Sequence, residues 1–275
     1  MEGLKSAGKR EIFILLLSAA FSSFLLWQGC GGGGGAAIDQ VDRLLGEVAE
    51  RLERVWSTVD AWKGFDFEDA SFTARIDASL HESRIAADEL SGLLFELDRD
   101  YSGFLENLQP LISELISKCR EGLKELVPAL EELSALSKAI EPVMREEAVI
   151  TQMEAPRSDQ EWLERLRRLE GALKASLPAL KNLSPGGSRF PGLKNALLEI
   201  FSLLDEMVRR LASSLPGRAG QRNISIEDKF DRMQDLIRGW DGLVDREFSG
   251  LSIFKLDPHL ERVELEINEL LLRRR

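Results

Sequence analysis

Residues 38–62, IDQVDRLLGEVAERLERVWSTVDAW, decide the fold of this chain. Apolar side chains recur there at alternating spacings of three and four residues, and charged side chains fill most positions between them. This spacing is that of a heptad seam, in which one stripe of a helix packs against a second helix. The stripe consists of Ile38, Val41, Leu45, Val48, Leu52, Val55, Val59 and Trp62. We therefore predict a long amphipathic helix, with Gly64 as its C-cap.

Similar apolar stripes follow in the rest of the chain. They cover residues 90–115, 112–133, 193–215, 230–244 and 260–270. Pro110 and Pro128 interrupt them, and because these prolines are 18 residues apart they are five helical turns apart. One continuous helix would therefore be kinked twice on the same face, whereas a broken one would start anew at each proline. The pattern leaves both alternatives open.

The composition supports helices throughout. Leu, Glu, Arg, Ala and Lys dominate the sequence, aromatic residues make up only 7% of it, and there is a single Tyr. Residues that favour strands are too few and too scattered to predict a sheet. We therefore expect an all-α fold: an elongated, coiled-coil-like helical bundle with Pro-kinked amphipathic helices.

Gly- and Pro-rich breaks divide the chain. We expect residues 1–29 to form a signal peptide or signal anchor and residues 30–37 a Gly-rich tether. A first helical segment covers residues 38–184, and a second covers residues 192–275, continuing the same bundle. The stretch SPGGSRFPG, residues 184–192, is the strongest break between the two segments.

The beginning of the chain combines basic and oily residues. Lys5, Lys9 and Arg10 precede an apolar run over residues 12–27, the layout of a secretory signal peptide. Gly29 and Cys30 follow, and then the run Gly31–Gly35. Residues 1–35 resemble a bacterial lipoprotein signal peptide, which implies that Cys30 is the lipid attachment residue and that the glycines are its tether. Trp27 and Gln28 depart from the residues that the family prefers before its cysteine.

A second interpretation of the same residues is an uncleaved signal anchor. Sixteen apolar residues are short for a helix that crosses about 30 Å of hydrocarbon, and extending the helix would require glycines. Both interpretations place the body of the chain outside the cytoplasmic membrane, because basic flanks stay inside. We therefore expect a membrane-anchored, extracytoplasmic protein in the periplasm or at the cell surface.

The sequence offers little for catalysis. His81 and His259 lack metal-binding partners at helical spacing, and no nucleophile elbow, P-loop or haem motif is present. Cys119 lies on an apolar stripe and is expected to be a buried thiol. The net charge of −11 argues against nucleic-acid binding. We expect no enzyme activity, no cofactor and no metal site.

Three functions remain open. The first is an anchored helical scaffold of the bacterial envelope, which binds partner proteins or a second copy of itself. The second is a binding module for lipid or another amphiphile. Residues 103–216 are faintly similar to the helical tails of Mce-type lipid-transport proteins, in the Pro-interrupted pattern of LKELVPAL and LKASLPAL, although the β-rich domain of that family is missing. The third is the extracytoplasmic part of a sensor.

Overall fold

The structure is a computed structural model that describes residues 34–67, 69, 71–101, 108–152, 156, 158–183, 187–214 and 224–272. These residues form helices joined by short turns and contain no strand, so the expected all-α fold is confirmed. The elements are α2 (Gly34–Trp62), α3 (Phe72–Tyr101), α4 (Gln109–Gln152), α5 (Asp159–Asn182), α6 (Pro191–Ser214), α7 (Ile224–Arg238), α8 (Trp240–Phe248), η1 (Ser252–Lys255) and α9 (Asp257–Leu272).

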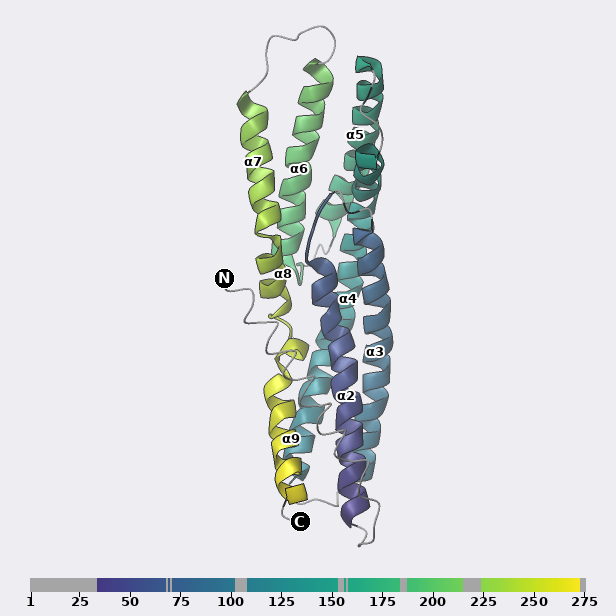
Figure 1. Cartoon of the computed structure of the whole chain (residues 1–275), viewed down its shortest axis with the longest axis vertical. Helices are drawn as coiled ribbons and strands as arrows, with labels where there is room; N and C mark the ends of the chain where they lie inside the picture. Colours follow the sequence, from purple (N-terminus) through teal and green to yellow (C-terminus); the bar gives the residue numbers. More distant parts are fainter. Residues whose placement is uncertain are drawn as a thin grey trace.

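The helices form an elongated bundle around α4, which runs along its whole length (Figure 1). The lower part of α4 in Figure 1 packs against α3 and α9, and α2 packs against both of these helices. The upper part packs against α5, followed in order by α6 and α7. After α7, the chain descends through α8, η1 and α9 back to the end of the molecule where α2 begins.

The heptad stripe of α2 is buried as predicted. All eight side chains of the stripe, from Ile38 to Trp62, are at most 5% exposed. The helix begins at Gly34, however, four residues before its predicted start, so the last part of the expected tether 30–37 is helical. Ala36 and Ala37 account for the difference, because alanine has the highest helix propensity. Gly64 has φ +67°, the left-handed conformation of a C-cap, which confirms the predicted helix end.

Pro110 and Pro128, at which the sequence allows either a kink or a break, have different roles in the structure. Pro110 is the second residue of α4, where the missing N–H of proline costs no helical hydrogen bond. Pro128 lies inside α4, and the helix continues through it. The residues that follow it, Ala129 and Leu130, are buried in the core, so tertiary packing compensates for the lost hydrogen bond.

An aromatic cluster fills the middle of the molecule, where α2 ends and α8 begins. Phe65 lies between Phe72 and Trp240, with ring centroids 5.2 Å and 4.9 Å away. The Trp240 Nε1–H donates a 2.6 Å hydrogen bond to the Trp62 carbonyl oxygen, which satisfies the polar end of a fully buried ring. We call Trp62, Phe65, Phe72 and Trp240 the waist cluster. It joins the lower and upper parts of the bundle.

Carboxylates fix the turns around this cluster by accepting hydrogen bonds from backbone N–H groups that no helix satisfies. The four donor–acceptor pairs are Gly64 N to Asp241 at 2.8 Å, Arg189 N to Glu132 at 2.9 Å, Gly192 N to Glu247 at 3.1 Å and Ser252 N to Glu125 at 2.9 Å. We call Glu125, Glu132, Asp241 and Glu247 the waist carboxylates. Each carboxylate binds a turn that is far from it in the sequence, so these acidic side chains have a structural role.

Candidate functional site

Of the two cysteines, only Cys119 lies within the described residues. Cys30, the predicted lipid attachment residue, lies outside the described residues, as do residues 1–29. Cys119 is fully buried, as predicted, and burial raises the pKa of its thiol to about 12. A thiol with such a pKa is protonated at physiological pH and is therefore a poor nucleophile.

The histidines and carboxylates do not converge on a metal site within the described ranges. His81 is exposed on α3. The Nδ1 of His259 lies 3.5 Å from Glu114 Oε1, and Arg262 is a second basic neighbour of that carboxylate. This arrangement joins α9 to α4 and is best explained as a surface contact between helices.

A depression of about 560 Å³ lies between α3 and α4. It is lined by Asp98, Ser113, Ile116, Ser117, Arg120, Glu121 and Lys124. Arg120 Nη2 donates a 2.8 Å hydrogen bond to Asp98 Oδ2 across it, so charged groups already satisfy one another there. An apolar ligand needs a mainly apolar lining, which this depression lacks. This depression therefore gives no support to the amphiphile-binding alternative, which stays a prediction.

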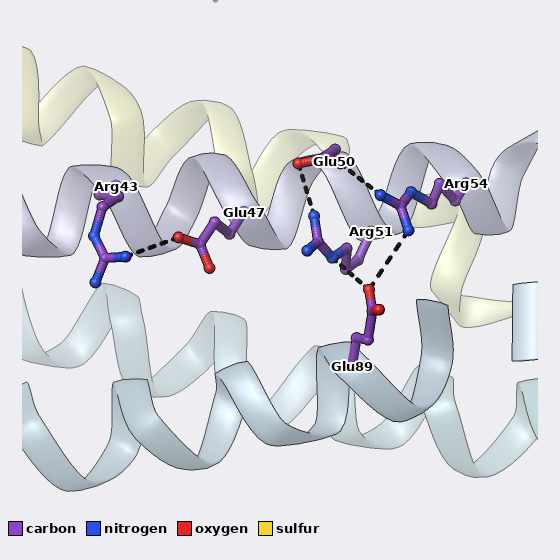
Figure 2. A network of polar contacts seen from close by, with 6 residues as sticks. All are labelled: Arg43, Glu47, Glu50, Arg51, Arg54 and Glu89. Carbon is purple, nitrogen blue, oxygen red and sulfur yellow. Dashed lines mark hydrogen bonds and ion pairs between the residues drawn. The ribbon is translucent and has the colours of Figure 1, made fainter. Parts of the chain in front are cut away.

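Charged side chains also join α2 to α3. Figure 2 shows Arg51 and Arg54 of α2 converging on Glu89 of α3, with N–O distances of 2.7 Å and 3.5 Å, while Glu50 pairs with both arginines from the other side. The hydrogen bond from Arg54 is the main cause that lowers the pKa of Glu50. With the Arg43–Glu47 pair, the network in Figure 2 contains three arginines and three glutamates. Its charges balance, so it offers no basic surface to a nucleic acid.

The tryptophans separate into core and surface residues. Trp62 and Trp240 belong to the waist cluster, and the partly buried Trp56 donates from Nε1 to the Ile253 carbonyl at 3.1 Å. Trp162, by contrast, is 41% exposed in the first turn of α5. Ser158 is the N-cap of this helix, because its Oγ accepts a hydrogen bond from Glu161 N. Trp27 lies outside the described residues.

Three large apolar side chains are exposed at one end of the molecule. Trp162 begins α5, Leu211 lies in the last turn of α6, and Phe230 lies in the second turn of α7; their exposed fractions are 41%, 41% and 49%. The helices α5, α6 and α7 are successive neighbours, and these ends are together at the top of Figure 1. We call Trp162, Leu211 and Phe230 the far-end surface. Aromatic side chains are enriched at protein interfaces, so these three exposed residues are the candidate positions for an interaction.

At the opposite end, α2 and α9 pack against each other in antiparallel directions. Glu264 of α9 is partly buried, and this burial raises the pKa of its carboxyl, as do the nearby charges of Asp42 and Glu261. Two large side chains on α9, Leu265 and Leu272, are 66% and 64% exposed. This end therefore brings acidic side chains of two helices near each other, and it exposes two leucines of α9.

None of the helices in the described residues is long and apolar enough to cross a membrane. Comparison with protein-family models, curated proteins and solved structures finds no match to this chain. The geometry of the described residues is therefore the basis for the functional proposal.

Sequence reasoning missed two features of this geometry. The waist carboxylates and the N–H groups they bind are 55 to 177 residues apart, so no local pattern reveals them. The far-end surface was also missed, because Trp162 and Phe230 fit the helical periodicity of a core stripe. Whether such a residue is covered depends on how far the neighbouring helices extend.

Proposed function

We propose that this protein is a membrane-anchored, extracytoplasmic helical scaffold of the bacterial envelope, which binds a protein partner or a second copy of itself and performs no catalysis. The anchor is Cys30 or the apolar leader before it, and the helical bundle is the interaction module. The resemblance of residues 1–35 to a lipoprotein signal peptide supports the anchor.

The observation that carries the proposal is the far-end surface. Trp162, Leu211 and Phe230 lie at the end of the bundle opposite Gly34, the first described residue after the expected tether. In an anchored chain, this end is therefore the part of the bundle farthest from the membrane. Tryptophan and other aromatic residues contribute much of the binding energy at protein interfaces, so their exposure at the accessible end favours an interaction role.

Metabolic labelling with a palmitate analogue tests the anchor in the full chain. We expect the wild-type protein to incorporate the label and to sediment with membranes, and we expect the Cys30→Ala variant to lose the label. Labelling that persists in Cys30→Ala would contradict lipidation at this residue. A wild-type chain recovered in the soluble fraction would contradict the anchor itself.

Site-specific photocrosslinking in intact cells tests the interaction surface. A photoreactive phenylalanine analogue replaces Trp162 or Phe230 in the full chain, and a matched control carries it in place of Val127, which is 50% exposed in the middle of α4. We expect discrete adducts from the two far-end positions only. Adducts of equal yield from position 127, or none from positions 162 and 230, would contradict an interface at this end.

A further inference from the structure

We draw no further inference here: the strongest candidate, the depression between α3 and α4 that Ser113, Ser117 and Lys124 line, has only exposed polar side chains around it, and nothing in the described part of the chain shows which ligand would occupy it.

Discussion

Gly122 of α4 lies directly against Ile253 of η1. A Cβ atom at this position would lie 3.0 Å from the Cα and N atoms of Ile253, a backbone that cannot move aside like a flexible side chain. Glycine therefore permits η1 to pack on α4, and Ile253 is fully buried as a result. Gly171 on α5 is different, because a Cβ there would meet nothing within 4 Å.

The two glycines make a matched pair for measuring this packing. Gly122→Val should lower the free energy of unfolding by about 2 kcal/mol, because the added side chain overpacks the contact with η1. Gly171→Ala should raise it by about 0.5 kcal/mol, since alanine is the better helix former. Urea unfolding followed by circular dichroism measures both. An unchanged midpoint in Gly122→Val would contradict the close approach.

Glu125 should make the stability of the fold depend on pH. Its hydrogen bond from the Ser252 backbone N–H is the main cause that holds the pKa of this carboxyl below its ordinary value of 4.5. A lowered pKa stabilises the folded chain above pH 4.5, and this contribution is lost as the pH falls through the folded-state pKa. Glu125→Gln should therefore cost about 1 kcal/mol at pH 7 and much less at pH 3. Thermal unfolding at both pH values measures the difference; a constant cost would contradict the mechanism.

The sequence predicts burial of single residues well only inside regular stripes. Ile38 to Trp62 are buried as their heptad spacing predicts, because a seam has one apolar face and that face must be covered. Trp240 and Trp162 both lie on or beside apolar stripes, yet one is fully buried and the other is exposed. The difference is tertiary: α2 and the waist cluster cover Trp240, whereas Trp162 lies at the end of its helix.

At the scale of the element, α4 shows what periodicity cannot decide. A proline inside a helix costs about 3 kcal/mol, comparable to the gain from burying one or two leucine side chains. Whether Pro128 breaks the helix thus depends on the packing of the residues around it, which belong to a core shared with other helices. The caps are more local, and the helix end at Gly64 is where the sequence predicts it.

The contact between α9 and α2 should strengthen in acid. Partial burial, together with the charges of Asp42 and Glu261, raises the pKa of Glu264. The folded chain is therefore favoured where this carboxyl is protonated, and that advantage is lost as the pH rises through the raised pKa. Glu264→Gln should increase the free energy of unfolding at pH 7 by about 0.3 kcal/mol, and the gain should shrink in acid.

Hydrogen exchange of the α9 amides measures this effect locally. Glu264→Gln should slow exchange in α9 at pH 7 relative to the wild-type chain. The control is Glu269→Gln, which removes the same charge from an exposed position of the same helix. Equal slowing in both variants would mean that net charge, and not the nearby charge of Asp42, is the cause.

At the scale of the whole molecule, the waist cluster connects the lower and upper parts of the bundle. Trp240→Ala should lower the free energy of unfolding by about 4 kcal/mol, because it leaves a cavity and removes the donor to the Trp62 carbonyl. We also expect its thermal transition to separate into two steps, since the upper helices lose their main contact with α2. Trp162→Ala should change stability by less than about 0.5 kcal/mol. Differential scanning calorimetry measures both variants, and a single sharp transition in Trp240→Ala would contradict the connecting role.

The fold class could be predicted from the sequence, but the path of the chain could not. Helical stripes and breaks indicate an elongated all-α bundle, and the structure confirms it. The return of α9 to α2 brings together residues more than two hundred positions apart, such as Asp42 and Glu264, whose charges act on each other. The spacing of apolar residues within a helix does not reveal such pairs, because each helix has an apolar stripe that fits several neighbours equally well.

The unbroken course of α4 has a mechanical consequence. Its 44 residues rise 1.5 Å each, so the helix measures about 66 Å from end to end. If the chain is anchored to a membrane as we propose, this length sets the distance from the membrane at which the opposite end of the bundle can bind a partner. A continuous helix of this length would also transmit a force applied at one end of the bundle to the other end, because α4 has no flexible joint between them.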